Sequence, residues 1–131
     1  MHTTGAMMDV FDPALLDNAA QSPWGTPGTF AVIERRGRPW RLTCIETAEE
    51  HLYTVHGGQQ YARDTGFRLN ATAANRTDQL VPLTEARLTY LQVLAFQREV
   101  TQWQPSLDAP AQVRAYGALA RAWRQASGPT S

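Results

Sequence analysis

Apolar and polar positions alternate with a period of two along residues 29–69. In the first run, Phe30 and Val32 share one face of the expected strand, and Ala31 and Ile33 share the other. Glycine, proline and acidic residues interrupt the alternation at intervals, as turns between strands do. The strand-like runs cover residues 29–36, 40–47, 51–55, 59–63 and 67–69. The pattern predicts about five short strands joined as an antiparallel meander.

Strands this short and this closely spaced favour a meander that curls into a small barrel. In architecture the spacing resembles that of SH3-like barrels in general. No family motif accompanies this resemblance, so it implies a fold and no activity. Residues 70–79 are polar and small, and we expect them to form a loop.

After residue 84 the apolar period lengthens to that of a helix. The pattern predicts helices over residues 84–102 and 109–126, with Thr84 and Asp108 as N-caps. Their apolar stripes have matching spacings and consist of Val93, Phe96, Val100 and Trp103, and then Val113, Tyr116, Ala120 and Trp123. A short connection between two such stripes favours an antiparallel helical hairpin.

The first 28 residues differ from the rest in pattern. Asp12 and Pro13 are typical of a helix start, and a short helix is expected to follow them. The proline- and glycine-rich run over residues 22–28 then interrupts regular structure. The sequence therefore predicts an N-terminal arm over 1–28 and one α+β domain over 29–131, with the sheet in 29–69 and two helices in 80–127.

Composition excludes several classes of protein. The chain has 131 residues, of which 43% are apolar, so it is long enough for one core and too apolar to be disordered throughout. No run approaches the roughly 18 apolar residues of a membrane helix, and no signal-peptide pattern begins the chain. A lone cysteine, Cys44, excludes an internal disulfide. We expect a soluble cytoplasmic protein that does not associate with membranes.

The charges balance overall, but their distribution is uneven. Residues 1–29 carry three aspartates and no basic residue, whereas residues 30–70 carry six arginines against five carboxylates. All twelve basic residues are arginine. Coding in a GC-rich genome explains this bias, and so does selection of the guanidinium fork for binding phosphates and carboxylates. Because the net charge is zero, the chain has no overall positive potential that would favour the second explanation.

The sequence contains no pattern that predicts catalysis, a metal or a cofactor. Cys44, His51 and His56 lack the spacing of zinc ligands. Glu46, Glu49, Glu50 and His51 cluster around one expected turn, where solubility alone explains them, and no nucleophile motif accompanies them. We therefore expect a non-enzymatic protein without a bound cofactor.

Nucleic-acid binding is the sharper functional hypothesis. Small barrels bind single strands through exposed aromatic side chains beside arginines that contact the backbone. The candidate residues are Arg35, Arg36, Arg38 and Arg41 on the first hairpin, with Tyr61, Arg63 and Arg68 on the next part of the sheet. Tyr61 and Arg63 share a face and could form an exposed platform. Trp40 shares its parity with Leu42, which favours a place in the core.

Protein interaction is the alternative hypothesis. The protein would act either as an adaptor that binds another protein or as a homodimer. The first C-terminal helix has more apolar surface than one neighbouring helix would cover. It would lie either between the sheet and the second helix or at a subunit interface. The candidate interface residues are Leu88, Leu91 and Ala95 on the first helix, and Arg114 and Arg121 on the second.

Overall fold

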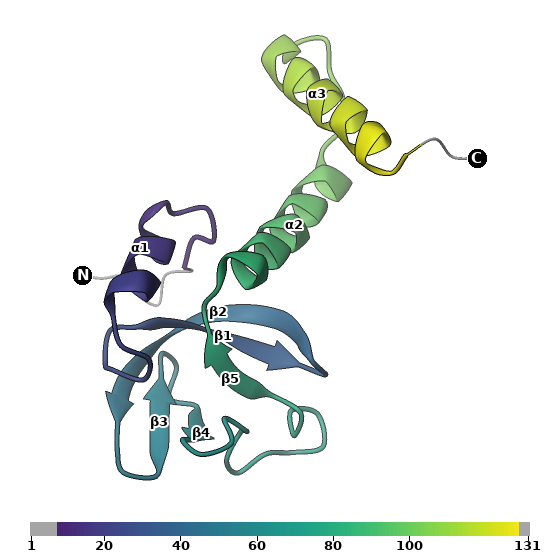
Figure 1. The fold of residues 1–131 in the computed structure, drawn as a ribbon. Coiled ribbons are helices and arrows are strands. Elements are labelled where there is room, and N and C mark those ends of the chain that lie inside the picture. The colour runs from purple at the N-terminus through teal and green to yellow at the C-terminus, as the bar shows by residue number, and fades with distance from the viewer. Residues whose placement is uncertain (1–7, 129–131) are drawn as a thin grey trace. The chain divides into compact units, whose positions relative to one another are not determined.

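A computed structural model describes residues 8–128 of the chain (Figure 1). In chain order its elements are α1 (Ala14–Gln21), β1 (Phe30–Arg35), β2 (Arg38–Ala48), β3 (Leu52–Val55), β4 (Gln60–Ala62), β5 (Gln79–Pro82), α2 (Glu85–Gln102) and α3 (Pro110–Ala126). The first seven residues of the expected arm lie outside the described part. The chain forms two compact units that divide between Phe96 and Gln97, within α2.

The first unit is built on one antiparallel sheet with the strand order β4-β3-β2-β1-β5. The first four strands follow one another as a meander. The fifth strand pairs with the free side of β1, where Val32 lies opposite Val81. The expected α+β class with a small curled antiparallel sheet is therefore confirmed.

Two hydrophobic clusters lie on opposite faces of this sheet. The helix-side cluster consists of Leu15, Val32, Leu42, Val81, Leu83, Leu88 and Leu91, and it joins the sheet to α1 and to the first turns of α2 (Figure 1). The inner cluster consists of Ala31, Ile33, Ile45, Tyr53, Val55, Tyr61 and Leu80, which all belong to strands. Apart from Trp24 and Gly25, which lie against Tyr53, the residues that bury this second face belong to strands, so the sheet curls and the face packs largely on itself.

The position of the fifth strand differs from the sequence prediction. Residues 67–69 were expected to form it, but Phe67 and Arg68 make only single bridges, to Gln79 and Tyr61. The strand that completes the sheet is Gln79–Pro82. Its pairing with β1 joins residues almost fifty positions apart, and a local periodicity carries no signal of such a pairing.

The helix boundaries agree with the pattern within one residue. The Thr84 hydroxyl accepts a hydrogen bond of 3.2 Å from the Arg87 amide and so caps α2 as expected. The Asp12 carboxylate accepts one of 2.9 Å from the Ala14 amide at the start of α1. Asp108 does not cap α3, whose N-cap is Ala109 without a side-chain hydrogen bond.

Candidate functional site

The β1–β2 hairpin has a two-residue turn at Arg36 and Gly37. Arg35 lies opposite Arg38, and the two turn residues have φ values of 55° and 75°. Positive φ at both central positions is the geometry that matches the twist of the flanking strands. The Arg36 amide donates a hydrogen bond of 3.2 Å to the Thr77 hydroxyl, which ties the hairpin tip to the loop before β5. The turn therefore presents the Arg36 side chain at an exposed position.

A β-bulge changes the environment of Trp40. Ile33 lies opposite Arg41 and Glu34 lies opposite Pro39, so that Trp40 has no partner on β1. Its side chain is 37% exposed, whereas Leu42, two positions along, is 7% exposed and belongs to the helix-side cluster. Alternation predicted a core position for Trp40, and this prediction is wrong because the extra residue moves the indole out of the regular pattern.

Two guanidinium groups lie over the Trp40 ring. The Cζ atom of Arg35 is 3.6 Å from the ring centroid, and that of Arg41 is 4.1 Å from it. At these distances the cations interact with the π face of the indole. The ring thereby limits the positions of both arginine side chains.

A buried carboxylate fixes Arg35 further. Arg35 donates from Nε to Asp78 Oδ1 at 2.7 Å and from Nη2 to Oδ2 at 3.0 Å. The Asp78 side chain is fully buried, whereas that of Arg35 is 32% exposed. The hydrogen bond to Asp78 raises the pKa of Arg35, which outweighs the opposing effect of burial. This two-point pairing sets the plane of the guanidinium at the end of the sheet.

The sheet register brings four predicted arginines to one end of the inner face. Residues directly opposite each other on paired strands project to the same side. Arg41 lies opposite Ile33, and Arg68 lies opposite Tyr61, both residues of the inner cluster. Arg35 follows Ile33 by two positions and lies opposite Arg38. We call Arg35, Arg38, Arg41 and Arg68 the arginine cluster.

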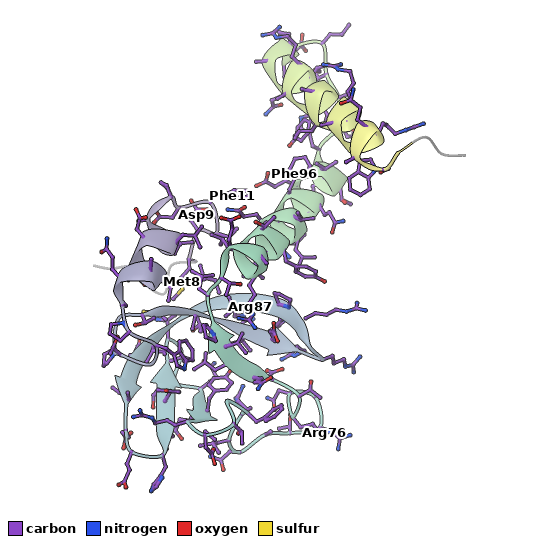
Figure 2. All side chains as sticks on the ribbon, in the orientation of Figure 1. Met8, Asp9, Phe11, Arg76, Arg87 and Phe96 are labelled. Atoms are coloured by element: carbon purple, nitrogen blue, oxygen red, sulfur yellow. The ribbon has the colours of Figure 1, made fainter. Side chains whose placement is uncertain are left out.

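The arginine cluster carries more positive charge than its neighbours neutralise. Among residues 8–128, Asp78 is the only carboxylate that forms an ion pair with an arginine of the cluster. The nearby Glu34 forms its ion pair of 3.0 Å with Arg87 instead. Two more exposed arginines flank the cluster, Arg36 at the hairpin tip and Arg76 in the loop before β5, where it projects outward (Figure 2). The result is a local basic surface on a chain of neutral net charge.

Tyr61 lies in the core and not on an exposed platform. Its side chain is fully buried in the inner cluster, and its hydroxyl makes no hydrogen bond of accepted geometry within the described residues. Burial raises the pKa of the Tyr61 hydroxyl, and the nearby guanidinium groups of Arg68 and Arg41 act in the opposite direction. The expected exposed platform of Tyr61 and Arg63 is therefore absent, because β4 directs this tyrosine into the curled sheet.

Arg63 lies beyond the arginine cluster, against the β2–β3 connection. It donates a hydrogen bond of 2.9 Å to the backbone oxygen of Glu49, and its Cζ atom is 5.1 Å from the Tyr53 ring centroid. Of the seven residues predicted to bind nucleic acid, four form the arginine cluster, Arg36 lies at its side, and Tyr61 and Arg63 serve other contacts. Two aromatic residues that were not among the predicted binding residues, Trp40 and Phe67, are 37% and 46% exposed.

The predicted interface residues fall into two environments. Leu88 and Leu91 are 5% and 4% exposed and belong to the helix-side cluster, so they are core residues of the first unit and leave no free surface for a partner. Ala95 is half-buried on the same helix. Arg114 and Arg121 are exposed on α3 in the second unit. The first turns of α2 therefore cover the sheet, which was one of the two expected alternatives.

The second unit leaves most of its apolar side chains in contact with solvent. None of the residues of α3 is buried. Trp123 is 71% exposed and Leu119 is 48% exposed. Within this unit the ring centroids of Trp103 and Tyr116 are 4.4 Å apart, and Trp103 Nε1 donates to Gln112 Oε1 at 2.9 Å.

Three further observations concern metal binding, the cysteine thiol and membrane spans. Within residues 8–128, no three His, Cys, Asp or Glu side chains gather as a metal site would require. Burial raises the pKa of the Cys44 thiol, which lowers its thiolate fraction at neutral pH. No helix in the described part is long and apolar enough to cross a membrane.

Comparison with family models, curated proteins and solved structures gives no match to this chain.

Proposed function

We propose that the protein is a non-enzymatic nucleic-acid-binding protein that contacts its ligand through the arginine cluster and the hairpin tip. The supporting observation is the local excess of guanidinium groups around Trp40, with Asp78 as their paired carboxylate. Guanidinium groups held in fixed positions donate two hydrogen bonds at a time to phosphate oxygens. The exposed edge of Trp40 and the ring of Phe67 provide apolar surface for unpaired bases.

The proposed architecture is an SH3-like barrel, and it agrees with this use of the sheet end. The bridges from Phe67 and Arg68 to residues of β5 and β4 connect the two edge strands of the curled sheet. Connected edges hold the side chains at the end of the sheet in a fixed arrangement, which reduces the entropy lost when a ligand binds. The ligand class we propose is single-stranded, because unpaired bases are free to stack on aromatic rings.

The proposal is tested by fluorescence anisotropy with labelled single-stranded DNA, duplex DNA and RNA, each over a series of salt concentrations. We expect affinity to fall with salt and to be higher for one of the single strands. The variant R36Q/R38Q/R41Q should lose three phosphate contacts, which lowers the slope of log K against log salt by about two to three. The variant R98Q/R114Q/R124Q removes the same charge from exposed helical positions and should retain the slope.

Two outcomes would count against this function. Absence of binding to all three nucleic acids at low salt would remove it. Equal losses in the two triple variants would show that binding follows the net charge of the chain and has no location at the arginine cluster. Circular dichroism of both variants establishes that each retains the fold.

Protein interaction through the C-terminal helices is the second candidate function, in the form of an antiparallel hairpin that assembles with a partner or with itself. The observation that favours it is that no residue of α3 is buried, since a helical pair of this size gains little stability without a covering surface. The apolar stripe of α3 contains Tyr116 and Trp123, and Tyr and Trp are enriched at interaction hot spots. Sedimentation equilibrium of the chain and of its L119S/W123S variant distinguishes self-assembly from binding to a different partner. Self-assembly is supported if the chain has a mass above 14.6 kDa and the variant has a mass of 14.6 kDa.

A further inference from the structure

The arginine cluster lies at one end of the sheet. Arg35 and Arg38 lie opposite each other, Arg41 lies opposite Ile33, and Arg68 lies opposite Tyr61 at the other edge of the curl. The Cζ atom of Arg68 is 5.9 Å from the Tyr61 ring centroid, and Arg41 and Arg68 both oppose the rise in the pKa of Tyr61 that its burial causes. The register thus brings four arginines, from two strands and one bridging segment, to a common region.

The protein interior directly beneath the cluster is filled. Ile33, Tyr61 and Leu80 are 3%, 0% and 3% exposed and pack together in the inner cluster. The cluster therefore lies at the surface, above a filled core. Arginines gathered in one place suit the compact terminal group of a nucleic-acid strand, whereas internal phosphates are spaced along its backbone.

The charge of the cluster also fits an end group. Its four arginines and Asp78 leave three uncompensated positive charges. A phosphodiester carries one negative charge, whereas a phosphomonoester carries about 1.5 to 2 at neutral pH and has three terminal oxygens that accept hydrogen bonds. The contacts of Arg35 and Arg41 with Trp40 and of Arg35 with Asp78 fix guanidinium groups before a ligand arrives.

From this geometry we propose that the arginine cluster binds a terminal phosphomonoester of a nucleic-acid strand. The inference rests on the proposed nucleic-acid function and specifies which part of the ligand enters the cluster. Arg41 and Arg68 would contact the phosphate oxygens, and Arg35 would be positioned by Asp78 beside them. Arg36, at the hairpin tip, would contact the first internal phosphates.

The test compares one 12-nucleotide single strand in three forms, with a 5′ phosphate, with a 3′ phosphate, or with hydroxyls at both ends. The fluorophore is attached to the base of a central nucleotide, and anisotropy is measured at one salt concentration. We expect one phosphorylated form to bind at least tenfold more tightly than the hydroxyl form. The corresponding mononucleotide should compete with it, and adenosine should not.

Single-residue variants locate the effect. R41Q and R68Q should each reduce the preference for the phosphorylated end to less than threefold. R36Q, which lies outside the cluster, should weaken all three forms by a similar factor and retain the preference. R41K and R68K keep the charge and should retain part of the preference, and thermal melting followed by circular dichroism establishes that each variant is folded.

The outcomes separate this inference from the function on which it rests. Equal binding of the three strands would overturn the terminal-phosphate inference and leave nucleic-acid binding in place. An end preference that survives in both R41Q and R68Q would overturn the assignment to the arginine cluster. Absence of binding to every form would overturn both proposals.

Discussion

The ion pair between Arg35 and Asp78 allows a prediction in which two substitutions together cost less than one of them alone. The Asp78 side chain is fully buried and its carboxylate accepts two hydrogen bonds from Arg35. R35A leaves this charge without a partner in the core, which costs about 3–5 kcal/mol in the free energy of unfolding. D78A instead leaves Arg35, whose side chain is 32% exposed and remains in contact with water, so we expect a cost of about 1–2 kcal/mol.

The double variant R35A/D78A removes the buried charge together with its partner. Beyond the cost of D78A, the double variant loses the contact of Arg35 with Trp40, worth about 0.5–1 kcal/mol. The double variant should therefore cost about 1.5–3 kcal/mol and be more stable than R35A, with a coupling energy of about 2.5–4 kcal/mol.

Urea unfolding followed by far-UV circular dichroism measures all four free energies, and a constant m value across the set makes them comparable. If the double variant is no more stable than R35A, the cost of R35A arises from lost packing of the arginine and the buried charge is not its cause. The same result would remove Asp78 as the residue that positions Arg35 in the arginine cluster. R35K serves as a control that keeps the charge and loses the two-point geometry.

Three further predictions concern the core and the turns. L91A should cost about 2–5 kcal/mol because Leu91 is 4% exposed, whereas L107A at 95% exposure should change stability by less than about 0.5 kcal/mol in the same urea assay. Burial raises the pKa of the Tyr61 hydroxyl above 10.0, so this proton is lost at a lower pH in the unfolded chain than in the folded one, and the stability of the fold should decrease as the pH rises above 10. Between pH 8 and pH 10.5 the melting temperature should decrease less for Y61F than for the unchanged protein. Equal decreases would contradict the assignment. G66A places a Cβ atom 2.7 Å from a backbone oxygen of β5 at a φ of +81°, and G58A at +90° meets nothing within 4 Å; G66A should therefore lower the melting temperature more than G58A does.

Much of the candidate site was predictable from local sequence. The run Arg35 to Arg41 was expected on a hairpin, and the structure forms one with the turn at Arg36 and Gly37. Hairpins depend on residues a few positions apart, so their signals are present in a short window of sequence. The aromatic partner was misassigned because alternation assumes a regular strand, and the bulge at Trp40 breaks that regularity.

The burial of Tyr61 could not be predicted from its own strand. β4 has three residues, and alternation over so short a run does not show which of its faces is the inner one. That choice was made by the curl of the whole sheet, which brings Tyr61 against residues of the other strands. The same curl places Arg68 beside the hairpin arginines, although twenty-seven positions separate it from Arg41.

Local sequence patterns specify the individual elements, namely the helices over 85–102 and 110–126, the first four strands and the hairpin with its arginines. These elements depend on propensity, periodicity and turn chemistry, which act between near neighbours in the chain. Three features follow from the folded arrangement: the strand that closes the sheet, the side of the sheet that is the inner one, and the set of arginines at one charged end. Those outcomes depend on contacts between distant residues, because pairing of β1 with β5 and burial of Asp78 beneath Arg35 arise only when the sheet curls.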